Sequence, residues 1–227
     1  MRRIIAGLMV AGFAAGAVRA ADPLHPTVVE LYESQGCSSC PPANAVLNGL
    51  AGRDDLIALN FAVTYWDYLG WKDIFAKPAF TQRQRDYAQA GGRDGVSTPQ
   101  MIVNGRGVLV GSRRGEVDAA LARFDRGATG PAIDVSTNRI MIAAAPRGDA
   151  LVWLVRYDPR TVAVPIRAGE NGGRTLPHRN VVRELVELGR WNGTAASFAV
   201  PRRNDGLVNA VLVQAGRGGA IIAARRL

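Results

Sequence analysis

Two cysteines separated by two residues are the clearest candidates for chemistry in this sequence. They lie in residues 36–42, which read Gly-Cys-Ser-Ser-Cys-Pro-Pro, between a β-prone run and a segment with helical spacing. At a helix start, free backbone N–H groups and the positive end of the helix dipole stabilise a thiolate on Cys37. Cys40, one turn later, lies within reach to resolve a mixed disulfide. The pair predicts thiol–disulfide exchange that needs no organic cofactor.

Three other roles for the cysteine pair stay open. A structural disulfide is one, although so short a loop adds little entropic stabilisation to the fold. A metal site is another: zinc needs more ligands than Cys37, Cys40 and the only two histidines, His25 and His178, readily supply. Cu(I), however, needs only two soft ligands. The third role is that of inert cysteines.

A second segment places a proline just before an apolar run and an Asn104-Gly105 turn. Asn-Gly favours a hairpin because both turn positions tolerate positive φ. A cis bond before Pro99 would turn the Thr98 backbone toward the cysteines and expose a main-chain edge to an extended substrate. A trans proline at a strand start is the alternative. We predict Thr98 and Pro99 to be substrate-binding residues.

The elements that must position these residues alternate between strand and helix up to about residue 126. Strand-like runs cover 27–32, 56–63, 101–103 and 108–110, and helical spacing covers 41–51, a segment from Pro78 and 116–124. Such alternation predicts a layered α/β unit.

Beyond residues 127–131, which read Gly-Ala-Thr-Gly-Pro, helical periodicity nearly vanishes. Short β runs then follow at 133–136, 139–145, 151–157, 161–167, 180–191, 195–200, 208–214 and 220–224. Many short strands divided by turn residues predict an antiparallel sandwich or barrel, although the 180–191 run also fits a helix. We therefore divide the chain into a domain at 26–127 and a β-rich domain at 131–227.

The order of these features resembles the thioredoxin fold over roughly residues 26–126. More narrowly, residues 29–44, Val-Glu-Leu-Tyr-Glu-Ser-Gln-Gly-Cys-Ser-Ser-Cys-Pro-Pro-Ala-Asn, are similar to a family of secreted bacterial proteins of unknown function. The resemblance implies an α/β thioredoxin-like N-terminal domain followed by an all-β C-terminal domain. The chain departs from thioredoxins in having Gln35-Gly36 before the first cysteine and Ser38-Ser39 between the pair.

Thioredoxins bury a carboxylate on the strand that leads to the cysteines, and Glu30 is the corresponding residue at an offset larger by one. If it is buried near Cys40, it would act as a proton relay. The alternative is that Glu30 pairs with a nearby arginine on a sheet edge.

Four aromatic residues crowd into residues 64–71, directly after the second strand. Ligands of open α/β sheets bind beyond the carboxyl ends of the strands, which is also where Cys37 is expected. We predict that Trp66 and Tyr68 line a substrate groove; packing of this cluster onto the sheet is the alternative.

The long polar stretch 169–180 is read as a loop inside the β-rich part, and long loops of this kind often bind a partner. It lacks the Lys-Ser/Thr ending of a phosphate loop and opens no helix, so we exclude a nucleotide role. His178 is predicted to lie at the surface.

Residues 1–20 have the form of an export signal. Arg2 and Arg3 precede an apolar stretch at 4–18, and Ala20 ends a signal-peptidase-like site. The stretch is too short to span a bilayer comfortably, and we see no other membrane span. We expect a cleaved protein, periplasmic or secreted.

The net charge of the chain excludes few classes of function by itself. The chain carries 28 Lys+Arg and 19 Asp+Glu, or +9, and cleavage after Ala20 removes three arginines to leave +6. The basic residues are scattered with no interleaved aromatics, so we do not expect nucleic-acid binding. The expected partners are a protein or small-molecule thiol or disulfide substrate and a redox partner.

Overall fold

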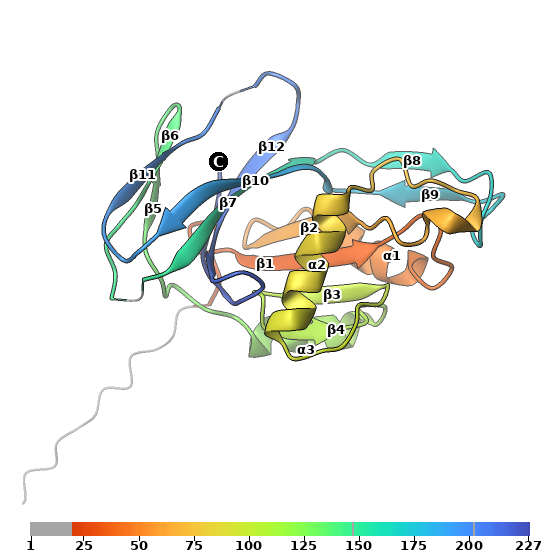
Figure 1. The fold of residues 1–227 in the computed structure, drawn as a ribbon, viewed down its shortest axis with the longest axis horizontal. Coiled ribbons are helices and arrows are strands. Elements are labelled where there is room, and N and C mark those ends of the chain that lie inside the picture. The colour runs from red at the N-terminus through yellow and green to blue at the C-terminus, as the bar shows by residue number, and fades with distance from the viewer. Residues whose placement is uncertain (1–19, 147, 202) are drawn as a thin grey trace, which may run out of the picture.

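The computed structural model describes residues 20–146, 148–201 and 203–227, so the predicted signal peptide, apart from Ala20, lies outside the described residues. The described chain is a mixed α/β fold built on one eight-stranded sheet, in the order β13-β12-β7-β10-β2-β1-β3-β4 (Figure 1). Three α-helices, a three-stranded sheet and a two-stranded sheet complete it.

Strands β1 (Thr27–Glu33) and β2 (Leu56–Ala62) are parallel neighbours in the middle of the large sheet. Every residue of both strands is buried, which explains why they read as nearly continuous apolar runs. β3 (Gln100–Val103) runs antiparallel to β1, and β4 (Gly107–Leu109) follows at the edge. The predicted turn between them is confirmed, because Asn104 and Gly105 have φ values of 47° and 66°.

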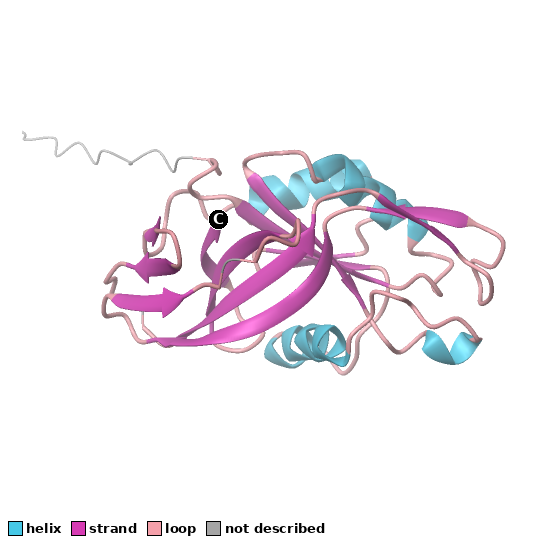
Figure 2. Cartoon of the chain, turned by 90° about the horizontal axis from the view of Figure 1, so that it is seen from above, coloured by secondary structure: helices cyan, strands magenta, loops and turns pink. Residues whose placement is uncertain are grey.

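Helices cover both faces of this part of the sheet (Figure 2). α1 (Pro41–Leu50) and α3 (Arg114–Arg123) share one apolar core with Val29 and Leu31. α2 (Pro78–Ala90) packs on the opposite face, with Val28 and Tyr32. A short 3-10 helix, η1 (Asp67–Leu69), precedes α2. No helix in the described ranges is long and apolar enough to cross a membrane.

The chain after residue 131 contributes strands only, within the described residues. They are β5 (Ile133–Val135), β6 (Arg139–Ile142), β7 (Ala150–Asp158), β8 (Val162–Pro165), β9 (Thr175–His178), β10 (Val181–Trp191), β11 (Ala196–Ala199), β12 (Val208–Ala215) and β13 (Ile221–Arg226). β10 is a strand, so the helical alternative for 180–191 is wrong. β9 lies inside the stretch that sequence patterning reads as a loop, because it is short and gains its regular pairing only from β8.

The later strands form no barrel in the described chain. β10 pairs in parallel with β2 through Val181 and Asn60, and β7, β12 and β13 follow it in the same sheet. β5, β6 and β11 form the three-stranded sheet, which packs against the large sheet in a separate core. The expected barrel is therefore wrong, because β10 pairs with β7 on one side and with β2, a strand of the first half, on the other.

The boundary at residues 127–131 carries neither helix nor strand. The hydrogen-bonded sheet nevertheless contains strands from both sides of it. The division into domains 26–127 and 131–227 stays a prediction, and the two segments share one sheet.

Candidate functional site

Cys37 and Cys40 form a disulfide between the end of β1 and the start of α1. Cys40 is the N-cap residue of α1, and prolines occupy the first helical positions. Both cysteines are buried, with Cys37 0 % exposed, whereas Ser38 and Ser39 between them are exposed. Cys37 Sγ lies 3.3 Å from Ser39 Oγ. The bridge thus stands at the positive end of the α1 dipole and is screened from solvent.

The predicted substrate-binding pair Thr98 and Pro99 lies beside this motif. The Thr98–Pro99 peptide bond is cis. Ser39 Oγ donates a hydrogen bond of 3.5 Å to Thr98 O. Thr98 is half-buried and Pro99 is buried, so the backbone at Thr98 lies next to the exposed serines of the cysteine motif.

The aromatic cluster divides between packing and exposure. Trp66 Nε1 donates a 2.7 Å hydrogen bond to Thr98 Oγ1, and Trp66 also packs against the core on the α2 face. Tyr68 stacks on Trp66 with ring centroids 6.5 Å apart and is 77 % exposed. Tyr65 packs inward and donates to Gln84 Oε1 at 3.1 Å. Trp66 and Tyr68 therefore reach the same corner as Thr98, and Tyr65 has the packing role.

Glu30 lies away from the cysteines. It shares the α2 face of β1 with Val28 and Tyr32, while α1, which begins after Cys40, packs on the other face. Its carboxylate accepts hydrogen bonds of 2.7 and 2.8 Å from Arg83 and of 2.7 Å from the hydroxyl groups of Tyr32 and Tyr87.

Burial alone would raise the pKa of Glu30, but Arg83 beside it and the hydrogen bonds that it accepts lower that pKa below its ordinary value. The structure therefore places Glu30 in a buried ion pair and gives no support to the predicted proton relay. The arginine partner anticipated as the alternative is present, in the interior and not on a sheet edge.

A second buried carboxylate of β1, Glu33, faces the α1 side near the cysteines. Glu33 Oε1 accepts a 2.6 Å hydrogen bond from Asn60 Nδ2 and lies 2.8 Å from His178 Nδ1. Asp73 is also buried, and its Oδ2 accepts the N–H of Gln35 at 2.8 Å. His178, expected at the surface, is buried because β9 brings it under the end of β1.

These groups perturb one another. Burial raises the pKa of Asp73 to about 6, and the neighbouring Glu33 adds to the effect. Burial would lower the pKa of His178, but the charge of Glu33 and the hydrogen bond to it raise that pKa above its ordinary value. We call Glu33, Asp73 and His178 the acid cluster. Buried groups with shifted pKa values next to a candidate site are a recognised sign of function.

The turn at 169–174, between β8 and β9, lies on the cysteine motif; we call it the latch. Asn171 Nδ2 donates to Gln35 O at 2.9 Å and to Cys37 O at 2.8 Å, and Asn171 is 0 % exposed. Glu170 Oε2 accepts the N–H of Ser38 at 2.9 Å, and this hydrogen bond lowers the pKa of Glu170. The stretch predicted to bind a partner thus binds the chain's own cysteine segment.

Sequence patterning misses Glu33, Asp73, Glu170 and Asn171. For Glu33 a signal exists: it has the same strand parity as Val29 and Leu31, which α1 covers. For the other three there is none, because long-range packing brings them to the site.

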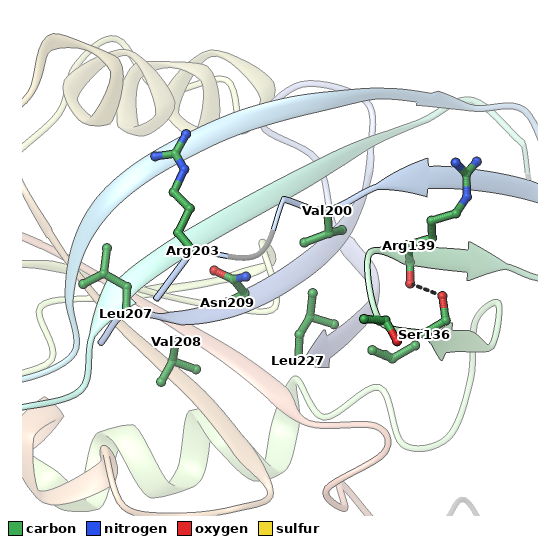
Figure 3. A pocket seen from close by; sticks show the side chains of 10 residues that line it. Ser136, Arg139, Val200, Arg203, Leu207, Val208, Asn209 and Leu227 are labelled. Atoms are coloured by element: carbon green, nitrogen blue, oxygen red, sulfur yellow. Dashed lines mark hydrogen bonds between the residues drawn. The ribbon is translucent and has the colours of Figure 1, made fainter. Parts of the chain in front are cut away.

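The structure also contains cavities away from the cysteines. One of about 310 Å³ opens between the β5–β6 turn, the segment before β12 and the C-terminus (Figure 3). Arg139 and Arg203 stand at it, but none of the predicted site residues lines it. In the described part of the chain, no three His, Cys, Asp or Glu side chains come together to hold a metal ion.

Comparison with solved structures finds proteins of similar fold. The crystal structure of protein AGR_C_4864 from Agrobacterium tumefaciens superposes with a TM-score of 0.76 at 31% sequence identity, over 92% of this chain and 95% of that chain. HBP35 of Porphyromonas gingivalis gives a TM-score of 0.61 at 12% identity, over 89% of this chain and 74% of that chain, which shows a likeness of fold alone. No curated protein matches the sequence.

The sequence profile of one family matches most of the chain. Its description is "Protein of unknown function (DUF1223)", and the match covers residues 28–214. That range contains the cysteine motif, the cis-proline segment and the latch. The chain therefore belongs to the DUF1223 family.

Proposed function

We propose that this protein is an exported thiol–disulfide oxidoreductase with a thioredoxin-like first half. The observation that carries the proposal is the Cys37–Cys40 bridge at the N-terminus of α1, with the Thr98–Pro99 segment against it. No other pair of thiols exists in the chain, since it contains only two cysteines.

The arrangement of the first half supports the fold assignment. Its elements follow the order β1, α1, β2, α2, β3, β4, α3, with α1 and α3 on one face of the sheet and α2 on the other. This order and layering resemble a thioredoxin fold, and the bridge occupies the loop between the first strand and the first helix.

The chemistry would be a two-step exchange. In the reduced protein, the Cys37 thiolate attacks a substrate disulfide, forms a mixed disulfide and expels one substrate thiolate. Cys40 then attacks Cys37 Sγ, so the second substrate thiolate leaves and the protein bridge closes. Two electrons pass to the substrate, and a partner dithiol must supply two electrons to reopen the bridge. Run in reverse, the same steps oxidise a substrate dithiol.

Substrate contacts would come from the corner around Thr98. Its backbone lies beside Ser39, and the exposed ring of Tyr68 stacks on Trp66 next to it. A main-chain edge beside the half-buried Trp66 ring and the exposed Tyr68 ring suits an extended polypeptide or a small apolar thiol. Because residues 1–20 have the form of an export signal, we propose that the reaction takes place in the periplasm or outside the cell, away from nucleic acid.

One observation favours a second function, a non-enzymatic envelope-binding protein with a static bridge. Cys37 is 0 % exposed, and the latch is hydrogen-bonded to it. The reduction potential distinguishes the two functions. A value far below that of thioredoxin, about −270 mV, identifies a static bridge, and a value near or above it identifies an exchanging one.

Trapping of covalent intermediates tests the oxidoreductase directly. With Cys40→Ser, Cys37 forms mixed disulfides that cannot be resolved, so reducible adducts should accumulate in cells. Cys37→Ser is the matched control and should give none. Absence of adducts, together with no reduction of insulin and no oxidation of thiols, would overturn the proposed function.

A further inference from the structure

The latch is a built structure with its own internal bonds. Gly173 N–H donates to Ile166 O at 2.9 Å, and Ile166 N–H donates to Arg174 O at 2.8 Å. Positive φ values of 74° at Gly169 and 83° at Gly173 shape the turn. At its base, Val164, Ile166 and Leu176 are buried in a core with Phe75 and Val181. The base is therefore anchored, and the tip at 169–174 is the part that can leave the cysteines.

Three hydrogen bonds hold the tip to the cysteine motif: two from Asn171 and one to Glu170. Asn171 is fully buried, and its amide satisfies the carbonyl groups of Gln35 and Cys37. Arg174 Nη1 donates to Asn171 Oδ1 at 2.7 Å and so fixes the orientation of that amide. A Cβ atom added to Gly169 would lie 3.4 Å from Trp71 Cβ, so the tip also packs against the neighbouring segment.

Glu170 brings a negative charge to the place where reduction creates another. Its carboxylate accepts the N–H of Ser38, which lies between the two cysteines and two residues before the N-cap residue of α1, Cys40. A backbone N–H next to Cys37 and the positive end of the α1 dipole would both stabilise a Cys37 thiolate. A neutral bridge does not repel the Glu170 carboxylate, whereas a Cys37 thiolate repels it and competes with it for the Ser38 N–H.

We propose that the latch is redox-sensitive: it closes over the Cys37–Cys40 bridge through Glu170 and Asn171 and is released when the bridge is reduced. A dithiol reductant supplies the two electrons and leaves as a disulfide. The S–S bond breaks, one proton of the dithiol goes to Cys40, the other goes to solvent, and Cys37 becomes a thiolate. The latch thus favours the oxidised protein, and reduction exposes the reacting sulfur.

Other charged groups surround Cys37 and must be counted with Glu170. Each packed element contributes: Arg174 from the latch, Asp73 from the segment before α2, Glu33 from β1 and His178 from β9. Glu170 is the one whose carboxylate is bound to the cysteine loop itself. Its removal should therefore lower the pKa of the Cys37 thiol, whereas removal of the Asn171 amide should leave it unchanged.

The kinetic test measures reduction of the bridge by dithiothreitol. Asn171→Ala should speed reduction about tenfold, because two hydrogen bonds that hold the tip are lost. Glu170→Gln should shift the equilibrium with dithiothreitol about tenfold toward the reduced protein, or about 30 mV. Arg167→Gln, at an exposed position two residues before the latch, is the control and should match the wild type. Equal rates and equilibria in all four proteins would overturn the latch.

Hydrogen exchange supplies the structural readout. In the oxidised protein, the amide hydrogens of Ser38 and Gly173 are bonded and should exchange slowly. In the reduced protein, the Ser38 amide should exchange at least tenfold faster, whereas that of Ile166 at the base should change less. Identical protection of Ser38 in both redox states would also overturn the proposal.

The proposal of a redox-sensitive latch rests on the proposed function in one respect only, because it requires that the Cys37–Cys40 bridge can be reduced. Dithiothreitol replaces the unknown partner, so the two ideas fail separately. If no mixed disulfides form in cells, the oxidoreductase fails and the latch measurements still stand. If Asn171→Ala and Glu170→Gln behave as the wild type, the latch fails and exchange through Cys37 is untouched.

Discussion

Glu30 and Glu33 lie three residues apart on β1, are both buried, and face opposite sides of the sheet in opposite surroundings. Glu30 has a full counter-charge in Arg83 and two tyrosine hydroxyl groups as donors. All of its acceptor capacity is used, and its pKa is lowered. On this side the sheet carries a fixed ion pair.

The acid cluster around Glu33 has two carboxyl groups and one imidazole, and Nε2 of His178 is buried with no hydrogen-bond partner among the described residues. Burial raises the pKa of Asp73 to about 6 there. β1 thus carries a fixed ion pair on its α2 face, whereas its other face adjoins Asp73, whose pKa is raised to about 6, and His178, whose pKa is raised above its ordinary value. The groups with raised pKa values therefore lie on the face of the sheet where no arginine of the described chain compensates the buried carboxylates.

The largest expected effect comes from breaking the compensated side. Arg83→Met leaves Glu30 buried without its counter-charge and should cost about 3–5 kcal/mol in the free energy of unfolding. Urea denaturation at pH 7 measures it. Arg113→Met, which removes an exposed arginine paired with Glu116, is the control and should change stability by less than about 0.5 kcal/mol. A loss below about 1 kcal/mol for Arg83→Met would mean that Glu30 is not a fixed charge.

The second effect is a pH dependence on the cysteine side. The folded-state pKa of Asp73, about 6, lies above its ordinary value of 3.8, so the native state binds more protons than the unfolded state between these values. Stability from this group is present at acid pH and is lost as pH rises through about 6. The stability of the wild type relative to Asp73→Asn should fall by about 1–3 kcal/mol from pH 4 to pH 7. Asp94→Asn, at an exposed position, should show no such slope.

The smallest effect is expected from His178. Its folded-state pKa is raised by Glu33, so its contribution is fully present below its ordinary pKa of 6.5 and is lost as pH rises through the higher folded-state value. His178→Ala should therefore cost about 1 kcal/mol more at pH 6 than at pH 9. His25→Ala, which removes the other histidine at a partly exposed position beside Asp22, is the matched control. If His178→Ala cost the same stability at pH 6 and pH 9, Glu33 would not be raising the pKa of His178.

Local pattern predicts the first half well. The strand before Cys37, the helix after Cys40 and the Asn104-Gly105 hairpin all depend on periodicity, prolines and turn residues that lie close together in the chain. The position of Glu30 relative to the cysteines could not be predicted in this way. A strand's two faces are distinguishable from its own residues, but which face receives α1 is decided by the crossover and the packing.

In the second half, prediction fails where a strand depends on pairing with a distant segment of the chain. β9 is short, polar and contains Pro177, so only its pairing with β8 makes it a strand. Because β9 is not recognised from the sequence, the burial of His178 is not predicted either. The junction of β10 with β2 involves a single residue pair, Val181 and Asn60, which are distant in the chain and carry no local signal of contact. The barrel expectation fails at this pair.

That junction has a consequence for the order in which the molecule matures. The chain is made from its N-terminus, so Cys37 and Cys40 emerge more than a hundred residues before β9 and β10. Until then β2 is a bare sheet edge, and nothing from the latch lies over the thiols. In the nascent chain the cysteines therefore lack the cover of the latch, so an oxidant can reach them before β9 and β10 are made. Addition of β8, β9 and β10 then closes the edge of β2 and brings the latch over the cysteines.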